Sequence, residues 1–135
     1  MATRFVWTPE GGYAFPASNF PEVGIDATTR HMYWAFDAAT DETVYLPGVA
    51  PQGLTGTLTA EVFYRMASAT TGRVRGECRV EAITPGDALD TDTTTSFAAS
   101  NSGGEVVPGT AGFLEVFTIT LTNADAIAAG DSFRL

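Results

Sequence analysis

His31 and Cys78 are the single histidine and the single cysteine of the chain, so nucleophilic or soft-metal chemistry has to include one of them. A Ser/His/Asp or Cys/His site would depend on His31, yet no Gly-x-Ser-x-Gly turn accompanies it. Structural zinc requires three or four nitrogen or sulfur ligands, and one His with one Cys falls short. We therefore expect no catalytic residue, no metal site and no cofactor. His31 is expected to face outward at the start of a strand, and Cys78 to be a small buried hydrophobe.

Carboxylates gather in two loop segments. Residues 85–92 contain Asp87, Asp90 and Asp92, and oxygen-rich loops of this kind bind calcium in some proteins, although the spacing is not that of an EF-hand. Residues 37–42 contain three more acids, the residue type that glycosidases use in pairs. Because Asp is also a common turn former, we interpret both groups as turns in solvated loops, with calcium at residues 85–92 as the alternative.

Aromatic side chains concentrate in the first quarter of the chain, where three prolines interrupt any regular pattern. This combination predicts an irregular N-terminal arm over residues 1–30 that packs on the domain or on a neighbour. Aromatic residues supply much of the binding energy at protein interfaces. We therefore expect partner contacts through Phe5, Trp7, Tyr13, Phe15 and Phe20. An alternative is that exposed aromatic rings stack on sugars, as in a lectin.

The charge balance narrows the class of partner. The chain carries 16 acidic and 7 basic residues, for a formal net charge of -9. A phosphate backbone or an anionic membrane surface would be repelled by such a field, so nucleic acid and membrane are not expected as partners. No apolar run approaches the roughly 20 residues that span a bilayer, and the first residues lack the apolar region of a secretory signal. These features predict a soluble protein made in the cytoplasm.

Strict alternation of apolar and polar residues predicts strands in three segments. In residues 57–65, one face carries Leu58, Ala60, Val62 and Tyr64. In residues 73–84 the outward face carries Arg73, Arg75, Glu77, Arg79 and Glu81, and the inward face Val74, Gly76, Cys78, Val80 and Ala82. In residues 113–121 the phase places Phe113, Phe117, Ile119 and Leu121 together. Shorter strands are expected at residues 4–7, 32–37, 43–46, 94–98, 105–107 and 131–135.

Only residues 122–130 are expected to be helical, with Thr122 or Asn123 as the N-cap and Gly130 at the end. The length of 135 residues fits one domain. Eight or nine short strands separated by Gly, Pro, Asp and Thr turns predict an all-β fold with antiparallel strands, a β-sandwich or a barrel. We assign residues 31–135 to a β-sandwich domain and residues 1–30 to the arm.

Short motifs from residue 33 onward also resemble a known domain family. In chain order these are Trp34-Ala-Phe-Asp, Asp41-Glu-Thr-Val-Tyr-Leu, Leu58-Thr-Ala-Glu-Val-Phe-Tyr-Arg-Met-Ala-Ser-Ala-Thr-Thr-Gly, Gly86-Asp-Ala-Leu-Asp, Thr118-Ile-Thr-Leu-Thr and Ala129-Gly-Asp-Ser-Phe-Arg-Leu. Together they resemble a small jelly-roll-like domain of tailed-bacteriophage structural proteins, found as a virion protein or as a module of head and tail fibres. The resemblance covers roughly three quarters of the chain and implies a jelly-roll-like sandwich.

The resemblance implies a function without catalysis. It suggests a bacteriophage capsid decoration, or cement, protein that binds the outer surface of the head and stabilises the shell. The implied partner is the major capsid protein of a tailed phage, the implied assembly is a homotrimer, and the implied location is the virion. The alternative is an adhesin module of a head or tail fibre that binds host-surface polysaccharide.

Overall fold

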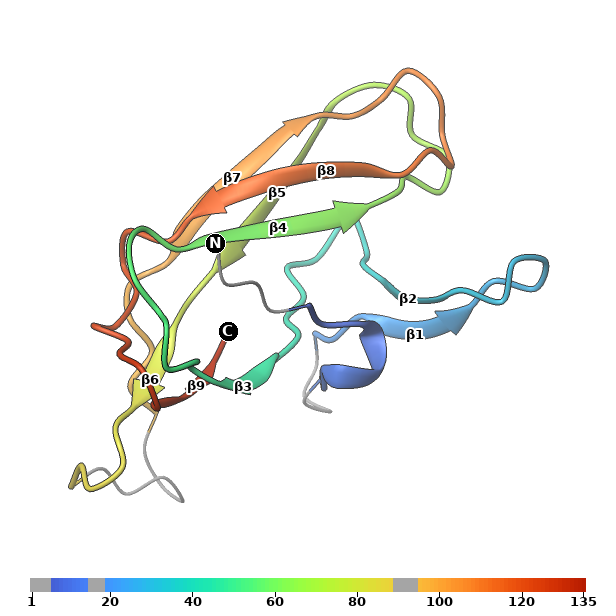
Figure 1. Cartoon of the computed structure of the whole chain (residues 1–135). Coiled ribbons are helices and arrows are strands. Elements are labelled where there is room, and N and C mark those ends of the chain that lie inside the picture. The colour runs from blue at the N-terminus through green and yellow to red at the C-terminus, as the bar shows by residue number, and fades with distance from the viewer. Residues whose placement is uncertain (1–5, 15–18, 89–94) are drawn as a thin grey trace.

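The computed structural model of the chain describes residues 6–14, 19–88 and 95–135, and the regular secondary structure of this part consists almost entirely of antiparallel strands (Figure 1). The all-β fold is therefore confirmed, whereas the jelly-roll topology stays a prediction. No helix in the described ranges is long and apolar enough to span a membrane. The elements are η1 (Pro9–Gly11), β1 (Glu22–Ile25), β2 (Met32–Ala35), β3 (Pro47–Val49), β4 (Thr59–Tyr64), β5 (Arg73–Cys78), β6 (Glu81–Ile83), β7 (Asn101–Val106), β8 (Glu115–Thr120) and β9 (Ser132–Arg134).

Two antiparallel ladders, β4 with β8 and β5 with β7, contain the main core. The burial of β4 and β5 alternates residue by residue, as the sequence predicts for both segments. The buried cluster consists of Val80, Phe117, Ile119 and Leu121, and the inward side chains of β4 and β5 pack against it. The period of two along each strand therefore separates a core face from a solvent face.

The two ladders meet where β7 lies alongside β8 (Figure 1). Glycines allow this close approach. A Cβ added to Gly76 would lie 2.8 Å from the Phe117 ring, and one added to Gly103 would meet the carbonyl oxygen of Thr118. Side chains at these two positions would therefore push the ladders apart.

A second sheet has the order β3-β9-β6, with β9 in the middle. Phe133 of β9 is buried, and its ring covers Gly48 of β3, where a Cβ would lie 2.7 Å from a ring atom. Short strands of this kind depend on packing, because three residues make few ladder bonds.

The third unit is the isolated hairpin of β1 and β2. The Tyr33 ring lies over Gly24 on the neighbouring strand. Arg65, which follows β4, places its guanidinium 5.4 Å from the centre of the Tyr33 ring and forms a 3.1 Å ion pair with Asp26. Hydrogen bonds from the backbone N–H groups of Thr29 and Thr28, together with Arg65, hold the pKa of Asp26 well below its usual range.

Several local expectations are wrong. Residues 73–84 do not form one strand, because the chain leaves the ladder after Cys78 and Glu81 begins β6 buried instead of outward. Phe113 is exposed, because β8 begins only at Glu115. β1 lies in the expected irregular arm and β3 lies outside every expected strand, and of residues 43–46 only Tyr45 makes a β-bridge. Residues 95–98 are not a strand, and neither are residues 6 and 7.

The predicted helix over residues 122–130 is also wrong, because this segment consists of turns. At its start, backbone groups bond to a polar side chain from a distant segment. The buried Asn101 accepts from the N–H of Asn123 at 2.8 Å and donates to its carbonyl at 3.0 Å. Asp125 and Ala126 adopt left-handed φ values of 52° and 51°, which end any helical run. At Asn123, side-chain hydrogen bonds thus replace helical ones.

Candidate functional site

Trp7 fixes the N-terminal segment to the body of the protein. Its indole N–H donates a 2.9 Å hydrogen bond to the carbonyl of Pro47 in β3. Its ring also meets Phe133 of β9 edge to face, with the ring centres 5.8 Å apart. Trp7, which the sequence predicts to contact a partner, is therefore engaged within the chain.

Tyr13 forms a second attachment point. Its backbone exchanges two hydrogen bonds with that of Tyr45, at 2.8 and 2.9 Å, and the two rings stack with their centres 5.4 Å apart. The stack continues through Phe97 to the guanidinium of Arg134, which lies 5.1 Å from the centre of the Phe97 ring. Tyr13 thus connects the N-terminal segment to the last strand of the chain.

An ion pair between a partly exposed Arg134 and a buried Glu81 adjoins this stack. The Glu81 side chain is fully buried, and its carboxylate accepts from Arg134 Nε at 2.6 Å and from the N–H of Ser96 at 2.7 Å. The Tyr13 side chain, followed by Glu81, raises the pKa of Arg134 above its ordinary value. Each partner satisfies the other, so neither is free for chemistry.

Phe20 behaves differently from Trp7 and Tyr13. It is 43% exposed and precedes β1, in which Val23 and Ile25 are exposed by half or more. Alternation did not predict this short strand, although the apolar residues of Val-Gly-Ile recur two positions apart, as in a strand. Phe5 and Phe15, the other two predicted contact residues, lie outside the described residues.

The hairpin also contains a polar group without a partner. The indole N–H of Trp34 is buried and has no hydrogen-bond acceptor among the described residues. A buried donor left in this way costs about 1–3 kcal/mol. No sequence pattern indicates this unpaired donor, because the position of an indole nitrogen depends on packing from distant segments.

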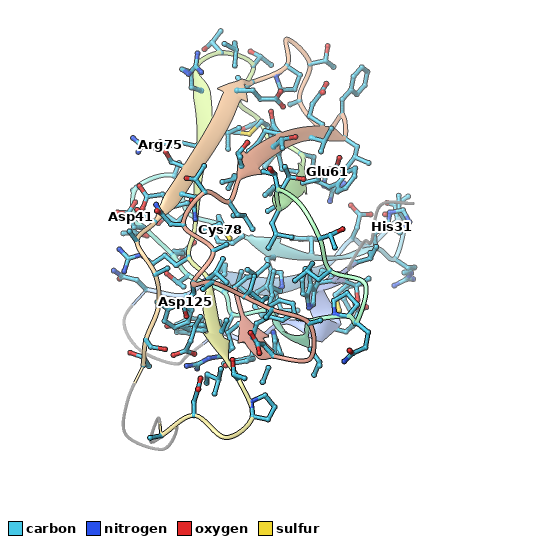
Figure 2. All side chains as sticks on the ribbon, turned by 60° about the vertical axis from the view of Figure 1, so that its left-hand side comes forward. His31, Asp41, Glu61, Arg75, Cys78 and Asp125 are labelled. Carbon is cyan, nitrogen blue, oxygen red and sulfur yellow. The ribbon has the colours of Figure 1, made fainter. Side chains whose placement is uncertain are left out.

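His31 and Cys78 do not form a site together. Figure 2 shows His31 at the far side of the molecule from Cys78, and His31 is exposed, as predicted. Cys78 is a free, partly buried cysteine packed against the core, and burial raises the pKa of its thiol to about 11. The thiol is therefore protonated near neutral pH, which suits a packing role.

Three carboxylates line an open hollow beside β6, and each accepts a backbone N–H. The bonds join Thr84 to Asp87 at 3.1 Å, Ala82 to Asp125 at 2.8 Å and Ala128 to Asp131 at 2.7 Å. In the described ranges no group of three or more His, Cys, Asp or Glu side chains is placed to hold a metal ion. Asp90 and Asp92 of the candidate calcium loop lie outside those ranges.

The acids of residues 37–42 are used in a turn. The N–H of Asp37 donates to Glu42 Oε2 at 2.6 Å, and that of Ala39 donates to Asp37 Oδ1 at 2.9 Å. Both bonds fix the loop that follows β2, as the turn interpretation predicts.

Compared with protein-family models, with curated proteins and with solved structures, the chain matches none of them. Its fold class follows from its own strands and ladders.

Proposed function

We propose that the protein is a non-enzymatic structural component of a bacteriophage virion, a decoration protein that binds the outer surface of the head and stabilises the shell. Its partner is the major capsid protein, and its assembly is a homotrimer. The motif resemblance from Tyr33 onward and the all-β fold support this proposal. The acidic surface also suits a protein that has no nucleic-acid partner.

One observation carries the proposal. Trp7 and Tyr13 attach their part of the N-terminal segment to the domain, and β1 is held by its ladder with β2, while Phe20, Val23 and Ile25 remain open to solvent. A binding element that is already fixed loses little conformational freedom when it docks. Exposed apolar side chains on such an element are typical of a protein contact. We therefore place the capsid contact on residues 20–25.

The adhesin alternative gains no support from the aromatic residues. Stacking on a sugar requires an open ring face, but Trp7 is engaged with Pro47 and Phe133, and Tyr13 is stacked on Tyr45. Decoration therefore remains the function that the arrangement supports best.

The test is to mix the purified protein with empty, expanded capsids of its source phage and to image the particles by cryo-electron microscopy. Extra density at regular lattice positions is expected for the wild-type protein. The double variant Phe20→Ser/Ile25→Ser should lose it, whereas Val49→Ser, an equally exposed change on β3, should keep it. Deletion of residues 1–22 is a weaker test, because it also removes the contacts of Trp7 and Tyr13 with the domain.

Absence of capsid density would overturn the proposal. If the wild-type protein were found instead at the tail or on a head fibre, the adhesin function would replace it, and a glycan array would follow. Density that persists in the double variant would reject residues 20–25 as the contact and leave decoration standing.

A further inference from the structure

A group of exposed apolar side chains lies at one end of the two core ladders. β4 and β7 end there and β8 begins there (Figure 1). We call this group the distal patch; its members are Phe63, Val106, Phe113, Leu114 and Val116, and Leu114 is 71% exposed. Phe63 and Val116 are direct cross-strand partners, so their side chains are neighbours on one face.

The protein's own core does not use this surface. Next to Phe63 in β4, Val62 and Tyr64 point inward and pack on the buried cluster. The loops behind the distal patch are joined to each other and to the strands by backbone bonds, from Gly112 to Met66 and from Val107 to Gly72. The patch is therefore a fixed apolar surface, and surfaces of this kind mark contacts with other molecules.

Opposite charges flank the distal patch. Glu61 lies on β4, two residues before Phe63, and is on the same face. Arg73 on β5 is the direct cross-strand partner of Val106, and Arg75 follows on the same face. Figure 2 shows Glu61 and Arg75 on opposite sides of the molecule. Glu61 and Arg73 have no ion-pair partner in the part of the chain that the structure describes.

We infer that the distal patch is the contact between copies of this chain. A second copy fits this surface, because its Arg73 can lie next to Glu61 of the first copy. The apolar residues of the two distal patches then pack between these charges. Such a head-to-tail contact closes into a ring when the rotation between copies allows it. The inference deepens the proposed function, since it rests on the homotrimer in that proposal and names the surface that forms it.

The test is sedimentation equilibrium of the full chain in 0.15 M salt, from micromolar concentrations to about 1 mM. The expected particle is a closed ring of three chains of 14.2 kDa each. The variant Phe63→Ser/Leu114→Ser should raise the dissociation constant at least about tenfold. Ile25→Ser is the matched control, because Ile25 is equally exposed on the hairpin, and it should leave the constant unchanged.

Charge reversal gives a sharper readout that a general loss of stability would not reproduce. Glu61→Arg and Arg73→Glu should each weaken association by about tenfold, because each places like charges together. The double reversal should restore it. All four positions are exposed, so circular dichroism should show the same fold in every variant.

A wild-type chain that remains monomeric at every concentration would overturn the inference. So would an oligomer whose dissociation constant is unaffected by the serine and charge variants, because its contact would lie elsewhere. The outcome for capsid binding is separate. Self-association is measured without capsids, and Phe20→Ser/Ile25→Ser should abolish docking without changing the sedimentation of the free protein.

Discussion

The two parts of the molecule are stabilised in different ways. The β4, β5, β7 and β8 ladders bury an alternating apolar face around Phe117 and Ile119. The part around β3, β6 and β9 is joined by polar and aromatic contacts between distant segments, above all the pair of Glu81 and Arg134 next to the Tyr13 stack. An apolar core tolerates the exchange of one apolar residue for another of similar volume, whereas an ion pair requires both of its partners.

The largest expected effect is in the ladder core. Phe117→Ala should lower the free energy of unfolding by about 3–5 kcal/mol, because the Phe117 ring fills the space against Gly76 and Tyr64. Urea titration measures this loss. Thr118→Ala, an exposed change next to Phe117 in β8, should stay within about 0.5 kcal/mol of wild type. Equal losses in the two variants would contradict the division into core and solvent faces.

Loss of one ionic partner should have the next largest effect. Arg134→Met should cost about 2 kcal/mol, because it leaves the fully buried carboxylate of Glu81 without its cation. Adding Glu81→Gln should recover part of the loss, since the amide oxygen still accepts from Ser96 but carries no charge. Thermal unfolding of the two variants compares them directly. A double variant less stable than Arg134→Met alone would show that the buried charge is not the cause.

The Cys78 thiol should make stability fall at high pH. Its native pKa of about 11 lies above the ordinary value of about 8.5, so the folded protein keeps a proton that the unfolded chain releases. Below about pH 8.5 the thiol is protonated in both the folded and the unfolded chain, so it does not make the free energy of unfolding depend on pH. From there to about pH 11 the free energy of unfolding should fall more steeply in wild type than in Cys78→Ala. Parallel curves from urea unfolding at each pH would refute this.

The smallest expected effect is a gain in stability. Ala126 has a left-handed φ of 51°, and Ala126→Gly should relieve that strain and stabilise the protein by about 0.5 kcal/mol. Ala128→Gly is the control: Ala128 is not among the described residues with positive φ, so the same change should destabilise by about 0.5 kcal/mol. Differential scanning calorimetry resolves both. Changes in stability of the same sign in the two variants would show that strain at Ala126 is not relieved.

The part of the fold that was predictable from sequence is the part in which neighbours in the chain carry the information. Alternation placed Val62, Phe117 and Ile119 in the core and Arg75 outside. Alternation did not predict the strands that depend on distant segments. β3 begins with Pro-Gly, which is typical of a turn, and it is a strand because β9 pairs with it. The helix over residues 122–130 failed in the same way, through hydrogen bonds to Asn101.

The candidate site was predictable only in outline. The aromatic residues of the N-terminal segment were expected to make contacts, and Trp7 and Tyr13 do so with the domain. Their partners Pro47 and Tyr45 lie more than 30 residues away, and nothing local indicates the pairing. Of the distal patch, the exposure of Phe63 follows from the alternation of β4, whereas that of Leu114 is a result of where β8 starts.

The central position of β9 has a consequence for synthesis. β3 and β6 do not pair with each other and are joined only through β9, which follows both by many residues. During translation both strands therefore remain with open edges until residues 132–134 leave the ribosome. Pairings of such large sequence separation form slowly, and open edges promote aggregation while they last. From the order of elements we therefore expect the yield of folded protein to depend on chaperones and on the expression temperature.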